Sequence, residues 1–246
     1  MRLEGKVVIF AGAGGGMGTA APLLFAKEGA NVVVAARRAG PLEEIVAKIK
    51  AAGGEASYAI GDLTTEEGMQ HVVDYTEATY GRLDVMFNNL GDSAGRGLQL
   101  HETPMSDWDY LTDINLKAAY LCTRFAVPAF KRAGRGVIIH LSASRDIRMR
   151  GHAGYGAAKG GLIGLTQNTA LAYRKDNIRV VCLCPNSMGG DIHGDATDMP
   201  STELMRRGTA QDLAWAALFF ASDEAAWLTG LVVPIDGGNE LAVPTP

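Results

Sequence analysis

The sequence predicts an α/β fold in which one doubly wound parallel sheet carries helices on both faces. Three observations lead to this prediction. Short apolar segments alternate with longer segments of helical period along most of the chain. The apolar segments are continuously hydrophobic, as strands covered on both faces are. No repeat or low-complexity linker divides the 246 residues, so we expect a single domain over 1–246.

The first strand is expected over Lys6–Ala11, where an apolar run ends in glycines, and a segment of helical period follows over Met17–Glu28. The same alternation continues down the chain. The further expected elements are the strand Asn31–Ala35, the helix Leu42–Ala52, the strand Ala56–Ile60, the helix Thr65–Tyr80, the strand Val85–Asn88, a longer helix Met105–Ala133, the strand Val137–Leu141, the helix Ala153–Arg174 and the strand Val180–Cys184. Connections of this βαβ kind are right-handed and make the strands parallel.

The composition argues against several classes of partner. The net charge of −4 does not favour nucleic acid or an anionic membrane surface, since both attract basic proteins. No apolar run approaches the ~20 residues of a membrane span, and the first residues resemble neither a signal nor a transit peptide, so we expect a cytoplasmic protein. Cys122, Cys182 and Cys184 are too few for a disulfide framework, and the last two are expected in the core. No residue cluster has zinc-ligand spacing, and we expect no metal.

A glycine-rich turn joins the first expected strand to the first helix, with the sequence Gly12-Ala13-Gly14-Gly15-Gly16-Met17-Gly18. In this position Gly12 permits a tight turn, Gly16 lets the backbone approach a pyrophosphate, and Gly18 lets the helix pack closely. The helix N-terminus adds a partial positive charge. The turn therefore predicts a dinucleotide site, although a glycine-rich stretch alone can be a simple turn.

The second expected strand ends in Ala35-Ala36-Arg37-Arg38. At this point an acidic residue selects the ribose 2′-hydroxyl of NAD, whereas an arginine accommodates the 2′-phosphate of NADP. The chain has no carboxylate here, and the Arg37 guanidinium suits a phosphate. We therefore predict NADP(H), with NAD as the alternative; the arginines could also be an ordinary solvated pair.

Tyr155 and Lys159 lie four residues apart on an expected helix and so share one face. A carbonyl reduced by hydride transfer needs a proton at its oxygen, but an ordinary tyrosine, with a pKa near 10, is a poor acid–base group at neutral pH. A neighbouring ammonium stabilises the phenolate and lowers that pKa. The pair is typical of an acid–base site if the chain is a dinucleotide-dependent enzyme.

Together these motifs resemble the short-chain dehydrogenase/reductase family, from about Leu3 to Asn239. The resemblance implies a Rossmann-type fold and the interconversion of a ketone and a secondary alcohol. It assigns Tyr155 as general acid–base, and Lys159 as the residue that lowers the tyrosine pKa and holds the nicotinamide ribose. Asn115, in Asp113-Ile114-Asn115-Leu116, completes a proton relay through water.

The family also places a serine on the substrate oxygen. Its usual spacing, thirteen residues before the tyrosine, selects Ser142, whereas the register of the preceding strand selects Ala143. The turn before the strand tolerates a deletion, and we therefore prefer Ser142. Ser144 is the alternative.

Further cofactor contacts follow from the resemblance. They are Met17 in the glycine-rich turn, Asp62 and Leu63 near the adenine, Asn89 and Gly91 in Asn88-Asn89-Leu90-Gly91, and Pro185 and Met188 near the nicotinamide. The chain departs from the family pattern at four positions. Ala11 replaces a threonine, Leu90 an alanine, Asn186 a glycine and Gly190 a threonine.

The substrate itself is not named by the sequence. A short loop over about 186–201 is expected to border it. The residues expected to face it are Asp92, Ser93, Arg148, Met149, Asn186 and His193. By resemblance, the helices Met105–Ala133 and Ala153–Arg174 make a homotetramer, although their apolar faces could simply cover the sheet. Two other functions stay open: a 3-oxoacyl-carrier-protein reductase, which Arg148 and Arg150 would serve, and a non-catalytic nucleotide-binding regulatory protein.

Overall fold

The computed structural model describes residues 1–14, 17–93, 100–189 and 196–241, and its centre is a seven-stranded parallel sheet. The strands lie in the order β3-β2-β1-β4-β5-β6-β7. Their bounds are β1 Val7–Ala11, β2 Asn31–Ala36, β3 Glu55–Ile60, β4 Val85–Asn88, β5 Gly136–Leu141, β6 Ile178–Pro185 and β7 Leu231–Ile235. The doubly wound α/β fold is thereby confirmed.

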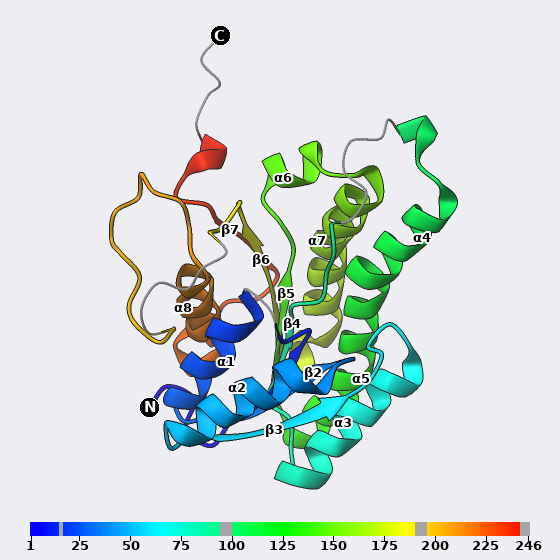
Figure 1. Cartoon of the computed structure of the whole chain (residues 1–246). Coiled ribbons are helices and arrows are strands. Elements are labelled where there is room, and N and C mark those ends of the chain that lie inside the picture. Colours follow the sequence, from blue (N-terminus) through cyan, green and yellow to red (C-terminus); the bar gives the residue numbers. More distant parts are fainter. Residues whose placement is uncertain (15–16, 94–99, 190–195, 242–246) are drawn as a thin grey trace.

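Helices cover both faces of the sheet, with α1 and α8 on one side and α5 and α7 on the other (Figure 1). Two large cores result: α1, α2 and α8 pack on one face, while α3 and α5 pack on the other. The helices are α1 Met17–Lys27, α2 Ala39–Ala51, α3 Glu66–Tyr80, α4 Met105–Thr112, α5 Ala118–Ala133, α6 Arg145–Arg150, α7 Ala153–Tyr173 and α8 Ala210–Ala221. Short 3-10 turns lie at Leu100–Glu102, Arg174–Asp176, Asp223–Ala225 and Asn239–Leu241.

The strand order reverses at β1, which pairs with β2 on one side and with β4 on the other. In open parallel sheets, ligands bind outside the carboxyl ends of the strands at such a reversal. The glycine-rich turn after β1 and the Asn88–Gly91 segment after β4 both leave the sheet at this point. The topology therefore places the two motifs beside one another.

One expected helix is divided in the structure. Met105–Ala133 was expected to be continuous, but a π turn over Asp113–Lys117 separates α4 from α5. A π turn is a single widened turn inside a helix, too short to be recognised from the helical period of the surrounding sequence. It contains Asn115. Such turns are frequent at functional sites.

Three further findings concern the cysteines, membrane spans and metal sites. Cys122, Cys182 and Cys184 are free and buried; burial of the last two was expected from the sequence. No helix within the described ranges is long and apolar enough to cross a membrane. In the same ranges, no group of three or more His, Cys, Asp or Glu side chains could hold a metal ion.

Candidate active site

The turn after β1 packs tightly against the segment after β4. Gly12 has a φ of +90°, which favours glycine, and its N–H donates to the Ala35 carbonyl at 2.9 Å. A Cβ on Gly18 would lie 2.9 Å from Asn89 Nδ2 and 3.0 Å from the Gly12 carbonyl oxygen. Asn89 Nδ2 in turn donates to that carbonyl at 2.8 Å. Gly12 and Gly18 thus have the roles that the sequence predicts, whereas Gly16 lies outside the described residues.

A cavity of about 600 Å³ opens at this point and extends to the expected catalytic residues. Most of the described residues predicted to bind the cofactor or to act on the substrate line it, whereas Asn115, Gly18 and the predicted residues after β6 and on α6 do not. The predicted residues that line it are Gly12, Arg37, Asp62, Leu63, Asn89, Gly91, Asp92, Ser93, Ser142, Tyr155 and Lys159. A single elongated cavity therefore joins the adenosine-binding and catalytic motifs.

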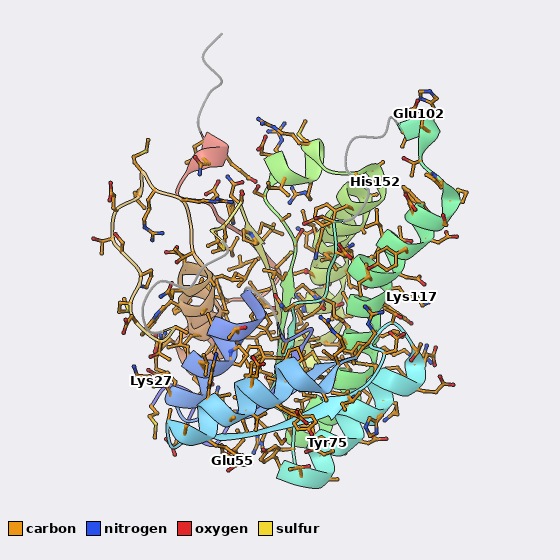
Figure 2. All side chains as sticks on the ribbon, viewed as in Figure 1. Lys27, Glu55, Tyr75, Glu102, Lys117 and His152 are labelled. Carbon is orange, nitrogen blue, oxygen red and sulfur yellow. The ribbon has the colours of Figure 1, made fainter. Side chains whose placement is uncertain are left out.

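Basic side chains gather at the end of the cavity beneath β2 and β3. Arg37 and Arg38 both line it. Hydrogen bonds from Thr64 lower the pKa of the Asp62 carboxyl, and the charges of Arg37 and Lys117 lower it further. Figure 2 shows Lys117 on the side of the molecule where the connection after β3 passes. The electrostatic environment at this end favours an anionic group.

Lys159 occupies the opposite end and is buried, with 4% of its surface exposed. Its Nζ donates to the carbonyl oxygens of Leu141 at 2.8 Å and of Leu90 at 3.1 Å. Burial lowers the pKa of the ammonium to about 8. The positive charge is therefore present at neutral pH and is lost as the pH rises through about 8.

The Lys159 ammonium lies 5.9 Å from the centre of the Tyr155 ring, close enough for a cation–π interaction. Tyr155 is half-buried and lines the same cavity. Both side chains come from α7, one helical turn apart, as their spacing predicts. A positive charge so close to a phenol favours its phenolate form.

Asn115 fixes the segment that follows β4. Its Nδ2 donates to the carbonyl oxygens of Asp92 at 2.8 Å and of Leu111 at 2.9 Å, and its Oδ1 accepts from Asp92 N at 3.3 Å. Gly91 lies between Asn115 and Lys159, since a Cβ there would be 2.7 Å from Asn115 Oδ1 and 2.8 Å from Lys159 Nζ. The structure therefore brings the predicted Asn115, Gly91 and Lys159 into direct contact.

The two candidate serines have different surroundings. Ser142 is buried beside Lys159, and its hydroxyl donates to the Lys159 carbonyl at 2.6 Å. Because that carbonyl belongs to a helix, it also has a helical N–H donor, and the hydroxyl can turn toward a substrate oxygen without leaving it unpaired. Ser144 caps α6: its Oγ accepts from Ile147 N and donates to Asn186 Oδ1, each at 3.4 Å.

We predict that the two serines can be separated by experiment. Ser142→Ala lowers kcat/KM about 10-fold, the effect of losing one hydrogen bond of about 1–1.5 kcal/mol to the substrate oxygen. Ser144→Ala instead costs about 1 kcal/mol of unfolding free energy, because a helix loses its cap. Kinetics and denaturant unfolding of both variants provide the measurements. A larger kinetic defect in Ser144→Ala would transfer the catalytic role to Ser144.

The segment after β6 borders the site from the other side. Pro185 is buried, and the half-buried Met188 packs against the core and pairs with Gly208 in a parallel bridge. Asn186 faces Ser144 instead of the cavity lined by Tyr155. Gly190 and His193 lie outside the described residues.

The α6 side chains expected to face the substrate point in different directions. Arg148 turns inward, where its guanidinium donates to the Ala143 carbonyl and lies 3.9 Å from Cys184 Sγ. Met149 is exposed. Arg148 is half-buried by these contacts, whereas Met149 is open to solvent.

The sequence did not reveal several groups that shape the site. Tyr110 of α4 lines the cavity and donates to Asp92 Oδ2 at 2.7 Å. Its spacing of four from Ile114, which also lines the cavity, was the available signal. The carbonyls of Leu90 and Leu141, which hold Lys159, are backbone groups and leave no residue-type signature.

The described residues fit a dinucleotide at two points. A Cβ on Gly12 would lie 3.0 Å from the Leu90 backbone nitrogen, so glycine lets the pyrophosphate-type turn pack closely on the segment after β4. Asn89 Oδ1 is buried without a hydrogen-bond partner, although Asn89 Nδ2 is satisfied. An acceptor left free beside the turn suits a ligand hydroxyl.

Comparison with known proteins agrees with this geometry. Residues 12–240 match the family model described as enoyl-(acyl carrier protein) reductase. Tropinone reductase-like 1 of Erythroxylum coca is 35% identical, over 99% of this chain and 93% of that protein. A 3-oxoacyl-(acyl-carrier-protein) reductase of Thermotoga maritima is 33% identical, over 97% of this chain and 99% of that protein.

Solved structures also match the fold over nearly the whole chain. A protein of Burkholderia xenovorans described as a short-chain dehydrogenase/reductase superposes with a TM-score of 0.86 at 29% identity, covering 98% of this chain and 99% of that one. The match extends over both ends of the cavity, from the glycine-rich turn to the Tyr155–Lys159 helix. The chain therefore belongs to the short-chain dehydrogenase/reductase family and is an oxidoreductase of the kind that uses a nicotinamide cofactor.

Proposed function

We propose that the protein is an NADP(H)-dependent oxidoreductase that interconverts a ketone and a secondary alcohol. The observation that carries this proposal is the buried Lys159 ammonium, held 5.9 Å from the Tyr155 ring at one end of the cavity. A protein that only binds nucleotides has no need of a phenol beside a buried cation. The pair is suited to protonating an alkoxide and to deprotonating an alcohol.

The roles of the side chains follow from their contacts. The cofactor, when bound, supplies or accepts a hydride. Tyr155 gives its proton to the carbonyl oxygen, and Lys159 lowers the tyrosine pKa through its charge. Ser142 orients the oxygen, while Asn115 keeps the segment after β4 in place and connects the site to solvent protons. For the alcohol, the same proton steps occur in reverse.

We expect Arg37, at the adenosine end of the cavity, to pair with the 2′-phosphate of NADP(H). Arg37→Gln lowers the preference for NADPH over NADH about 10-fold or more, since a charge-assisted hydrogen bond contributes about 1.5–3 kcal/mol. The ratio of kcat/KM for the two cofactors gives the result. Lys50→Gln, an exposed change on α2 outside the cavity, is the matched control. An unchanged ratio in Arg37→Gln, or a wild-type preference for NADH, would contradict the assignment.

The first experiment follows oxidation of NADPH, and separately of NADH, against a panel of ketones and diketones. Turnover with NADPH on any of these carbonyls supports the proposal. Tight cofactor binding without turnover on any of them would favour the regulatory reading.

A second candidate is reduction of a 3-oxoacyl-carrier protein, because one relative carries that name. An acidic carrier would dock on basic side chains at the mouth of the site. Arg148 is turned inward and Arg150 is paired with Asp146 at 2.6 Å, so α6 gives this candidate limited support. Acetoacetyl-carrier protein, compared with the N-acetylcysteamine thioester of acetoacetate, tests it. A kcat/KM at least about 10-fold higher for the carrier would support docking, since 1.4 kcal/mol corresponds to tenfold.

We also propose a homotetramer. Large apolar side chains are exposed on α5 and α7, namely Tyr120 and Leu171, and Trp227 near β7 is 97% exposed. Exposed apolar side chains on several elements are typical of subunit interfaces. We expect size-exclusion chromatography with light scattering to give four times the mass of 26.0 kDa. A monomer would show that these faces are solvent-exposed.

A further inference from the structure

A buried histidine lies directly beneath the proposed catalytic pair, although no step described above uses it. His140, on β5, has none of its surface exposed and precedes Leu141, whose carbonyl holds Lys159 Nζ. It pairs across the sheet with Asn88 of β4. A fully buried polar ring at the centre of a sheet requires a partner for each nitrogen.

Both ring nitrogens have partners, and the partners determine the tautomer. Thr123 Oγ1 donates its proton to the Ala119 carbonyl at 3.0 Å, so it must accept from His140 Nε2–H, 3.4 Å away. Asn88 Nδ2 can only donate, and it lies 3.3 Å from His140 Nδ1. His140 is therefore neutral, with its proton on Nε2. Burial, together with the nearby Lys159 charge, lowers its pKa to about 3 and keeps it neutral at working pH.

The contact with His140 also decides which way the Asn88 amide faces. With Nδ2 directed at the imidazole, Oδ1 faces the other way and accepts from Leu90 N at 3.3 Å. This bond from a side chain to the backbone two residues on is an Asx turn, which sets the local peptide orientation. The Leu90 carbonyl then receives Lys159 Nζ at 3.1 Å.

We propose that His140 is a positioning residue, which holds the Lys159 ammonium beside Tyr155 through the Asn88 amide and the Leu90 carbonyl. The chain of contacts is continuous from α5 to α7: Thr123, His140, Asn88, Leu90 and Lys159. The inference rests on the proposed function, because it concerns the group that tunes Tyr155. His140 itself touches neither cofactor nor substrate and acts only through the position of Lys159.

Two substitutions at His140 separate positioning from packing. His140→Asn keeps an acceptor where Nδ1 lies, so it keeps the Asn88 orientation. His140→Leu fills similar space but removes the acceptor and frees the amide. We expect His140→Leu to raise the pKa of Tyr155 by about one unit, a tenfold loss of phenolate at a given pH, and His140→Asn to stay within about 0.3 unit.

The measurement is an ultraviolet titration of tyrosinate in the intact protein. For the wild type and each variant, the titration of the same protein carrying Tyr155→Phe is subtracted, which leaves the signal of Tyr155. The pH profile of kcat for alcohol oxidation should shift in parallel. Because the titration requires no turnover, it remains decisive even if the wild type reduces no ketone, an outcome that would overturn only the proposed function. A lower melting temperature with an unmoved Tyr155 pKa in His140→Leu would mean that His140 is merely structural.

Thr123→Val is a second variant, which tests the proposal even if His140→Leu does not fold. Without the Thr123 acceptor, the imidazole proton moves to Nδ1, where it opposes Asn88 Nδ2 and turns the amide. We expect the pKa of Tyr155 to rise in this variant as well, while Thr123→Ser matches the wild type. If Thr123→Val leaves the Tyr155 titration unchanged, the proposed relay is contradicted.

Discussion

Tyr155→Phe is expected to reduce ketone turnover about 1,000-fold or more, because loss of a general acid–base group removes about 10²–10⁴ of the rate. The hydroxyl is the only part of the side chain removed, so the ring stays packed on α7 and in reach of Lys159. Cofactor affinity should change no more than about fivefold, since a neutral hydroxyl contributes about 1 kcal/mol. Steady-state kinetics and fluorescence titration of bound NADPH give the two values.

The matched control for this variant is Tyr173→Phe, at the far end of the same helix. Its side chain packs against Lys131, 5.3 Å from the ring centre, and is remote from the cavity. It should retain wild-type turnover. If Tyr155→Phe kept more than a tenth of wild-type kcat, another group would have to supply the proton.

Gly91→Ala is expected to lower kcat about 100-fold while the protein still folds. The new Cβ would lie 2.7 Å from Asn115 Oδ1 and 2.8 Å from Lys159 Nζ, closer than any such contact tolerates. Neither side chain can yield freely, because Asn115 holds the Asp92 backbone and Lys159 holds two carbonyls. Displacing the ammonium by one to two ångströms would raise the pKa of Tyr155 and remove part of its acidity.

Gly40→Ala provides the comparison, since a Cβ there meets nothing within 4 Å. It should leave both stability and activity near wild type. Melting temperature distinguishes misfolding from displacement of the catalytic groups: a folded, cofactor-binding Gly91→Ala with full activity would show that Lys159 is not needed at its present position.

Most of the sheet could be predicted because its strands are continuous apolar runs with glycines at their ends. Six strands were expected from the sequence pattern, and the structure extends β6 by several residues beyond Val180–Cys184. α6 was missed since six residues do not establish a helical period, and its start depends on the Ser144 cap. The π turn at Asn115 was also missed, because a single widened turn inside a helix does not show in the helical period of the surrounding sequence.

Part of the candidate site could likewise be predicted from the sequence, and part could not. Spacing alone places Tyr155 and Lys159 on one face of α7, and the strand order brings Gly12 beside Asn89. Other features depend on backbone and tertiary geometry. The carbonyls that hold Lys159, the imidazole under the strand ends and the inward turn of Arg148 all lie in contacts between distant segments. The types of the residues do not indicate these contacts.

In the proposed reaction, Tyr155 protonates the carbonyl oxygen while hydride reaches the adjoining carbon. Reduction of the responding ketone with NADPH deuterated at the transferred position tests it most directly, with mass spectrometry of the alcohol. We predict one deuterium on the carbinol carbon in the wild-type product, and no labelled product above background from Tyr155→Phe in the same time. Tight NADPH binding without deuterium transfer to any carbonyl in the panel would contradict the account.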